Sequence, residues 1–333
     1  MIIIISISND GTTNEVINWI THLSDEKILR INLDVDEVKL LKFDDDEKKF
    51  IIQVNSIEHN LYECTSYWYR KGGKIIKHIP GQYFGAGHHN ISYFLDMGIR
   101  VESDVLDSFI YNFLEEKSVF SIGKRSNATP NKLIVLEMAK NIGINIPESF
   151  LFTRKKDVLE KIKVKSLITK AASDGIYIFN DDYSYYTYTE LMDNKNLKKL
   201  PDTFFPSLFQ VNINKKFEIR SFFLGDQFFS MAIFSQNSQQ TKIDFRKYNQ
   251  TMPNRKIPYK LPKKMEESLK ILMKNLDLNT GSIDLIVDKN DNFYFLEVNP
   301  VGQFGMVSNP CNYMLEKKVA LSLVNKNFSY EEE

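Results

Sequence analysis

The sequence has few of the residues that build metal or disulfide centres. Its 333 residues include two cysteines, Cys64 and Cys311, with no CxxC pair and no cluster of cysteine and histidine. A zinc site is therefore not expected, and such sparse cysteine use is typical of a reducing cytosol. The apolar start MIIIISIS has no basic region before it and is too short for a signal peptide or a membrane span. We therefore expect a cytoplasmic protein that does not contact membranes.

The sequence also lacks a net charge, since 43 Lys and Arg balance 43 Asp and Glu. No overall field draws such a protein to nucleic acid or to an anionic membrane. A Walker A pattern and a GxGxxG pattern are absent, which excludes a P-loop or Rossmann nucleotide site, and no Ser/His/Asp arrangement stands out. The composition, 43% hydrophobic and 26% charged, is that of an ordinary globular protein.

The order of patterns predicts an α/β (α+β) protein of three parts. MIIIISIS is read as the buried first strand of a parallel sheet, and residues 1–120 as a small open α/β domain. Residues 121–205 alternate helix and strand and are expected to form a compact lid. Residues 206–333 are dominated by strands, which predicts a C-terminal domain with an antiparallel sheet.

The final pair of predicted strands, GSIDLIVD and NFYFLEVNP, carries polar residues among apolar ones. Side chains alternate between the faces of a strand, so Glu297 and Asn299 point the same way. If the two strands form a hairpin, Asp284 lies across from them. Oxygen ligands of this kind suit Mg²⁺. The alternative is an edge strand with its polar face in water.

Two lysines are candidates for anion binding. Lys132 falls in the first turn of a predicted helix that Thr129 would cap, where it either points to solvent or helps the helix N-terminus to hold an anion. Lys170 ends the apolar strand SLIT and precedes AASDG, where small residues and Gly175 allow backbone to approach phosphate. A simple β-turn would explain the same residues.

Two arginines are further candidates, because the planar guanidinium suits carboxylates and phosphates. In KFEIRSFF, Glu218 and Arg220 lie on one face of a strand, where an ion pair is the alternative reading. Arg246 lies in the basic, loop-like stretch KIDFRKYN.

Taken in order, these features resemble the ATP-grasp superfamily of carboxylate ligases over the chain from about Ile122 to Asn325. The segment NPVGQFGMVSNPCNYMLEKKVA is similar to the peptide-maturing ligases of the microviridin and grasp-with-spasm type, which make graspetides. The N-terminal YWYRKG resembles a segment of their pre-ATP-grasp domain. The resemblance implies an ATP-grasp fold with a pre-ATP-grasp domain (1–120), a central lid (121–205) and a C-terminal domain with the metal site (206–333).

The resemblance also implies roles for the candidate residues. Asp284, Glu297 and Asn299 would hold Mg²⁺ against the phosphates of ATP, and Arg220 and Arg246 would hold the transferring phosphoryl group or the acceptor carboxylate. The remaining candidates would contact ATP: Lys132, Lys170, Gly175, Gln210, Val211 and Glu218. In this set Gln210 and Val211 form the hinge that reads the adenine edge, and Glu218 reaches the ribose or the amino edge.

The implied reaction is ATP-dependent maturation of a ribosomal precursor peptide made of a leader and a core. An Asp or Glu side chain would be phosphorylated and then joined to a Ser/Thr hydroxyl or a Lys amine, giving an ester or amide macrocycle, ADP and phosphate. A homodimer is an expectation from relatives. A small-molecule carboxylate–amine ligase of the same fold, or a nucleotide-binding module without catalysis, are the alternatives. The non-catalytic module is disfavoured, because Asp284, Glu297, Asn299 and both candidate arginines are all present.

Overall fold

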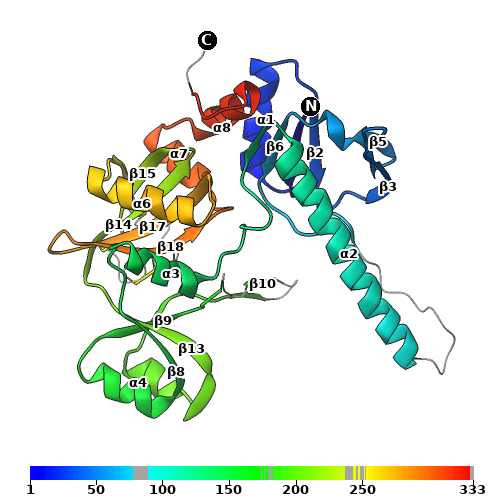
Figure 1. The fold of residues 1–333 in the computed structure, drawn as a ribbon. Coiled ribbons are helices and arrows are strands. Elements are labelled where there is room, and N and C mark those ends of the chain that lie inside the picture. The colour runs from blue at the N-terminus through cyan, green and yellow to red at the C-terminus, as the bar shows by residue number, and fades with distance from the viewer. Residues whose placement is uncertain are drawn as a thin grey trace. The chain divides into compact units, whose positions relative to one another are not determined.

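The computed structural model describes residues 1–77, 89–173, 175, 177–179, 183–236, 243–244, 247, 251 and 253–330. The chain forms two compact units, which we call unit 1 (Met1–Ala128 and Met314–Glu333) and unit 2 (Thr129–Tyr313). The blue beginning and the red end of the ribbon in Figure 1 thus belong to the same unit. Among the described helices, none is long and apolar enough to cross a membrane.

Unit 1 is built on a parallel sheet with the strand order β2-β1-β6-β7. Its strands are β1 (Ile2–Ser6), β2 (Ile28–Asn32), β6 (Ser66–Tyr69) and β7 (Phe120–Ile122). Every residue of β1 is buried, as expected for a central strand that is covered on both faces. The prediction of a buried first strand in a parallel sheet is confirmed. Helix α1 (Gly11–Leu23) follows β1 and is capped by Asp10, whose carboxylate accepts from the amides of Thr12 and Thr13.

A three-stranded antiparallel ribbon and a long helix complete the N-terminal part of unit 1. The elements are β3 (Val38–Asp44), β4 (Lys49–Val54), β5 (Ile57–Asn60), the 3-10 helix η1 (Leu61–Glu63) and α2 (His89–Lys117). The C-terminal half of α2 packs on the ribbon through aromatic rings. The Phe50 ring centroid lies 5.5 Å from that of Phe109 and 4.8 Å from that of Phe113. These contacts join the ribbon and the helix in one hydrophobic cluster.

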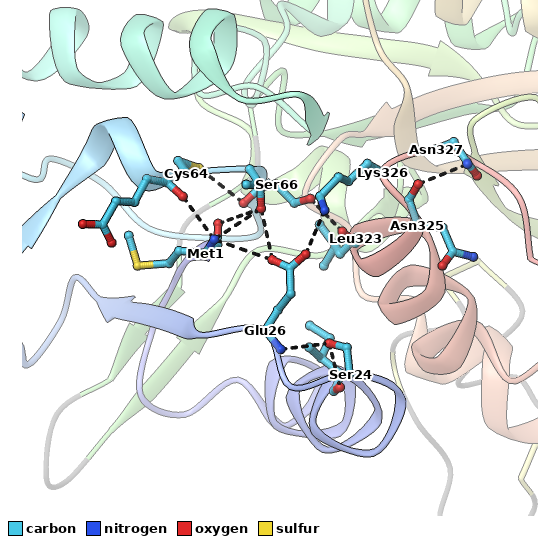
Figure 2. A network of polar contacts seen from close by, with 12 residues as sticks. Met1, Ser24, Glu26, Cys64, Ser66, Leu323, Asn325, Lys326 and Asn327 are labelled. Atoms are coloured by element: carbon cyan, nitrogen blue, oxygen red, sulfur yellow. Dashed lines mark hydrogen bonds and ion pairs between the residues drawn. The ribbon is translucent and has the colours of Figure 1, made fainter. Parts of the chain in front are cut away.

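The last helix, α8 (Leu315–Asn325), packs against α1 at the other end of the chain. Two polar contacts in Figure 2 hold this end of the chain in unit 1. The Ser66 hydroxyl donates to the carbonyl oxygen of Leu323 at 2.6 Å, and Lys326 Nζ lies 2.8 Å from Glu26 Oε1. Unit 1 is therefore completed by residues that follow the whole of unit 2 in the sequence.

The smaller sheet of unit 2 is antiparallel, with the order β12-β9-β13-β8. It consists of β8 (Ser149–Arg154), β9 (Leu167–Lys170), β12 (Glu190–Leu191) and β13 (Thr203–Val211), with helices α4 (Lys155–Ile162) and α5 (Asn194–Lys199) and the hairpin β10 (Tyr177–Phe179) and β11 (Ser184–Tyr186). Val158, Leu167, Met192 and Phe209 form its buried core. Most of this α+β segment lies in residues 121–205, the predicted lid, but β13 continues to Val211, in the part that was predicted to belong to the C-terminal domain.

The larger sheet of unit 2 has the antiparallel order β16-β15-β14-β17-β18, which confirms the predicted antiparallel sheet of the C-terminal region. Its strands are β14 (Lys215–Leu224), β15 (Gln227–Phe234), β16 (Arg255–Tyr259), β17 (Thr280–Asp288) and β18 (Phe293–Asn299). Helices α3 (Lys132–Asn141) and α6 (Lys263–Asn275) pack on one face of this sheet and share its hydrophobic core (Figure 1). The short helix α7 (Gly305–Cys311) follows β18 and contacts β14, β15 and β16.

Helix α3 starts later than predicted. Its N-cap is Asn131, whose side-chain oxygen accepts from the amides of Leu133 at 3.0 Å and Ile134 at 3.3 Å. Thr129 as the cap was therefore wrong, because an asparagine closer to the apolar stripe satisfies the same free amides. Lys132 becomes the first helical residue. The division into domains at 1–120, 121–205 and 206–333 stays a prediction, since the smaller and larger sheets both lie within unit 2.

Candidate active site

Three neighbouring strands of the larger sheet bring charged side chains into one row. Arg220 on β14 lies opposite Asp284 on β17, and Asp284 lies opposite Glu297 on β18. Residues directly opposite on antiparallel strands point to the same face, so the guanidinium and the two carboxylates share a face. Asn299 lies on the same face, opposite Ser282. The predicted hairpin is confirmed, with Asp284 directly across from Glu297 and Asn299 on the same face but diagonal to Asp284.

The two faces of this hairpin differ in chemistry. Val298 and Ile283 point into the hydrophobic core and are 4% and 0% exposed, whereas Asp284 and Glu297 are only partly buried. The register shifts between Asp284 and Leu285. Such β-bulges bend a strand, are common beside active sites and re-aim the side chains next to them. The sequence alternation and the bulge together present the carboxylates on a half-open surface.

Each carboxylate of the row lies near a cation. Lys132 Nζ lies 3.1 Å from Glu297 Oε2, and Arg220 Nε lies 3.7 Å from Asp284 Oδ1. The four side chains are 12% to 24% exposed, so solvent screens these pairs less than it screens surface pairs. A lysine at the first residue of α3 opposes the helix dipole, and the Glu297 carboxylate compensates for this. Lys132 thus faces a carboxylate of the protein itself, and its part in holding an anion at the helix N-terminus stays a prediction.

Lys132 also reaches the segment predicted to be the phosphate loop, because its Nζ donates to the carbonyl oxygen of Ser173 at 2.8 Å. Lys170 is the last residue of β9, opposite Leu208 on β13, so this segment starts directly after it. Gly175 has a φ of +83°, and a Cβ at this position would collide with the Thr187 hydroxyl. A glycine is therefore required there. The structure thus brings Lys132 to the loop that begins at Lys170.

Gln210 and Val211 end β13, where the chain leads into β14. Gln210 is 1% exposed, and its side-chain nitrogen donates to the Ser149 hydroxyl at 2.9 Å. The amide of Val211 donates to the carbonyl oxygen of Glu148 at 2.9 Å. Both residues are therefore fixed by Glu148 and Ser149 at the start of the edge strand β8, at the position where the resemblance implies a hinge.

Glu218 is buried, and two protein donors hold its carboxylate. Lys215 Nζ lies 2.6 Å from Glu218 Oε1, and the Ser235 hydroxyl donates to Glu218 Oε2 at 2.5 Å. Burial raises the pKa of Glu218, and the attraction of Lys215 offsets this only in part. Lys215 Nζ also donates to the carbonyl oxygen of Ile243 at 3.2 Å. The carboxylate thus lies in a polar cluster two residues before Arg220 on the same strand.

Sequence reasoning missed Lys215 and Ser235. Strict alternation puts Lys215 and Glu218 on opposite faces of β14, but the register shifts between Lys215 and Phe217, and this brings the lysine to the carboxylate. The only available signal was the spacing of the two charges in KKFEIR. Arg246, the second predicted arginine, lies outside the described residues.

The residues of the row fit Mg²⁺ by the chemistry of their donors. Asp284 and Glu297 supply carboxylate oxygens directly opposite each other, and Asn299 supplies an amide oxygen on the same face. Mg²⁺ prefers hard oxygen ligands and is often held by one or two carboxylates together with substrate phosphates. No group of three or more His, Cys, Asp or Glu side chains among the described residues is arranged to hold a metal ion. A Mg²⁺ ion at these two carboxylates would need further oxygen ligands, such as those of substrate phosphates.

Comparison with solved structures gives matches over nearly the whole chain. A RiPP-associated ATP-grasp ligase from Chryseobacterium gregarium, in complex with ADP and a leader and core peptide, is 23% identical with a TM-score of 0.79, and the match covers 99% of this chain and 98% of that chain. The macrocyclase MdnC from Microcystis aeruginosa MRC, bound with the precursor peptide MdnA, is 26% identical with a TM-score of 0.76, over 98% of this chain and 99% of that chain. The macrocyclase MdnB from the same organism is 21% identical with a TM-score of 0.70, over 97% and 98% of the two chains.

No protein-family model and no curated protein sequence matches this chain. The structural matches extend over both units, including the N-terminal residues where the sequence carries little signal. The chain therefore has the ATP-grasp fold, as its sequence predicts, in the form that RiPP-associated ligases and macrocyclases share.

Proposed function

We propose that this protein is an ATP-dependent ligase that matures a ribosomal precursor peptide. It phosphorylates Asp or Glu side chains of the peptide core and joins them to Ser/Thr or Lys side chains, with release of ADP and phosphate. The observation that carries the proposal is the row of Arg220, Asp284 and Glu297 on one sheet face, with Lys132 reaching it from α3. Such a row combines oxygen ligands for a cation with cations for phosphate oxygens.

In this proposal Asp284, Glu297 and Asn299 hold Mg²⁺, which neutralises charge on the phosphates of ATP. Arg220 and Arg246 hold the transferring phosphoryl group or the acceptor carboxylate. A guanidinium suits this task because its planar fork matches the oxygens of both groups. Arg220 extends from the centre of the larger sheet, where strands on both sides fix its backbone.

The nucleotide contacts come from the smaller sheet and from α3. Lys132, Lys170 and the loop at Gly175 hold the phosphates, and the hinge at Gln210 and Val211 reads the adenine edge. Glu218 acts on the ribose or the amino edge. Its carboxylate is held by Lys215 and Ser235, so these two residues also determine how it meets the nucleotide.

The proposed reaction needs ATP because the carboxylate of the peptide must first be activated. A carboxylate reacts poorly with nucleophiles, and phosphorylation turns it into an acyl phosphate with a good leaving group. Attack by a hydroxyl or an amine then forms the ester or amide and releases phosphate. Positioning and charge neutralisation provide most of the catalysis in such transfers. Water must be kept from the acyl phosphate, which is the task we assign to the smaller sheet as a lid.

The choice of a peptide as substrate is supported by the relatives. The Chryseobacterium gregarium ligase holds a leader and a core peptide, and MdnC holds the precursor MdnA. Both cover nearly the whole of this chain, and MdnC is 26% identical to it. We propose that the reaction takes place in the cytoplasm, where ATP is abundant.

We include a homodimer in the proposal, supported by the surface of α2. Its N-terminal two thirds carry many exposed apolar side chains, among them Phe94, Val101 and Val105 at 68%, 60% and 60% exposure. Positions separated by three, four or seven residues lie on one side of a helix. An apolar stripe of this kind on a helix is typical of an interface. A second copy would cover it with an identical stripe through a two-fold axis.

The proposed function is tested by mass spectrometry of product peptides. The protein is incubated with ATP, Mg²⁺ and peptides encoded by neighbouring short reading frames that contain Ser/Thr and Asp/Glu. We expect the loss of one water mass per crosslink together with one ADP per crosslink. Parallel samples without ATP should leave the peptide mass unchanged.

Two other results would point elsewhere. ADP release that depends on a small carboxylate and an amine, with no change of any peptide, would indicate a small-molecule ligase. Nucleotide binding without any ADP release would indicate a module that binds ATP without catalysis. Either result would contradict the proposal.

A further inference from the structure

The charged row and α3 place two carboxylates among two cations. Glu297 contacts Lys132 at 3.1 Å, and Asp284 lies 3.7 Å from Arg220. Like charges directly opposite on neighbouring strands repel each other, and Asp284 and Glu297 are such a pair. The two cations offset this repulsion. Together the four side chains carry no net charge.

A divalent cation that binds to this cluster without a nucleotide is attracted by the two carboxylates and repelled by Lys132 and Arg220. It gains two carboxylate ligands, but Lys132 already occupies one side of Glu297, and the cation is repelled by both Lys132 and Arg220. In a partly buried site such repulsion is felt more strongly than in water. The situation changes if phosphate oxygens are present, because they attract Lys132 and Arg220 away from the carboxylates and add ligands for the cation.

Lys132 differs from Arg220 in its ability to move. It extends from the first residue of α3 on a flexible stem, and its ammonium group is a compact point charge. It bridges Glu297 on the larger sheet and the Ser173 carbonyl of the loop after β9. A lysine at this position can exchange one anion for another without a change in the backbone.

We propose that Lys132 acts as an internal counter-ion of Glu297, so that a divalent cation binds well only when a nucleotide draws Lys132 onto its phosphates. This rests on the proposed function, because it assumes that Glu297 is a metal ligand. Lys132 is then a positioning residue as well as a phosphate contact. It holds the Glu297 carboxylate and the loop together, and it couples the binding of metal to the binding of nucleotide.

The proposal is tested with Mn²⁺ alone, in the absence of nucleotide, by following the electron paramagnetic resonance signal of free Mn²⁺. The wild-type protein is expected to bind Mn²⁺ weakly. Lys132→Met and Lys132→Gln should each bind it about tenfold more tightly, in the range typical of coupling between sites. Lys132→Gln keeps much of the length and a donor for the Ser173 carbonyl, so it separates the loss of charge from the loss of reach.

Two control variants complete the experiment. Lys140→Met removes the same charge from the exposed last turn of α3 and should leave Mn²⁺ binding unchanged. Lys132→Met combined with Glu297→Gln should lose the gain, which would locate the gained site at Glu297. Circular dichroism confirms that each variant is folded.

The outcomes separate this inference from the proposed function. If both Lys132 variants bind Mn²⁺ no more tightly than the wild type, the counter-ion role is wrong, whatever the protein does with peptides. If the gain appears but survives Glu297→Gln, the proposal is also wrong, because the carboxylate that Lys132 covers is not the ligand. Failure of peptide modification with the expected Mn²⁺ behaviour would overturn only the choice of substrate.

Discussion

At the scale of single residues, Glu297 is the side chain on which the site depends most. It lies near the end of a largely apolar strand, faces Asp284 across the hairpin and contacts Lys132. The Glu297 carboxylate does not contribute to the hydrophobic core, since the buried neighbours Val298 and Phe295 supply the packing. Its removal should therefore affect chemistry much more than folding.

We expect Glu297→Gln to reduce ATP-dependent turnover by about a hundredfold or more, because an amide is a poorer cation ligand and leaves phosphate charge uncompensated. Melting temperature should change little. The matched control is Asp291→Asn, which removes a carboxylate from the exposed turn of the same hairpin, where Asp291 is 67% exposed. ADP production under saturating ATP measures the effect, and full activity of Glu297→Gln would remove Glu297 from the metal site.

A second residue-scale prediction concerns the cysteines. Burial raises the pKa of Cys64 to about 12, and it also raises the pKa of Cys311. At pH 8 the Cys64 thiol stays protonated in the folded protein and has about a thousandfold less thiolate than a free cysteine. Iodoacetamide should therefore leave Cys64 unmodified in native protein and modify it in urea, as measured by peptide mass spectrometry. Rapid native labelling would show that Cys64 is accessible.

At the scale of elements, β14 follows the proposed hinge at Gln210 and Val211 and carries residues of both the polar cluster and the charged row. Two adjacent lysines at its start have opposite environments. Lys215 is 5% exposed and pairs with Glu218, whereas Lys216 is 49% exposed and pairs with Asp291. They carry the same charge on the same strand, so they provide a direct comparison of a buried and a surface ion pair.

We expect Lys215→Met to lower the free energy of unfolding by about 3 to 5 kcal/mol, because it leaves a buried carboxylate without its cation. Lys216→Met should cost less than about 1 kcal/mol. Urea unfolding followed by circular dichroism measures both. Equal effects of the two substitutions would mean that Glu218 is not buried in solution.

The same strand shows what could be predicted from the sequence. The pairing of Asp284 with Glu297 follows from alternation over residues 297–299, whereas the register shift beside it, which leaves both Phe295 and Val298 in the core, does not. The position of Lys215 does not follow, since a register shift overrides alternation. The cap of α3 was also missed, because Thr129 and Asn131 are both good caps and only the observed side-chain contacts distinguish them. The fold class was predictable from the order of the motifs. The partners of Lys132 were not predictable, because Glu297 and Ser173 come from distant parts of the chain.

At the scale of the whole molecule, the exposed apolar stripe of α2 predicts association. Val101→Lys places a charge at a position that is 60% exposed in the single chain. We expect it to convert a dimer into a monomer in light scattering at micromolar concentration, because burial of an unpaired charge is costly. Val119→Lys is the matched control, since Val119 is 73% exposed and lies just beyond the helix. A wild-type protein that is already monomeric would contradict the dimer.

The return of α8 to unit 1 has a consequence for synthesis on the ribosome. All residues of unit 2 are made before Leu315, Val319 and Leu323, which are buried in unit 1. The nascent chain can therefore complete unit 2 while the sheet made first still lacks its last helix and the contact between Ser66 and Leu323. Unit 1 can thus reach its final structure only after α8 has been made, and until then the apolar surface that α8 covers is open to aggregation.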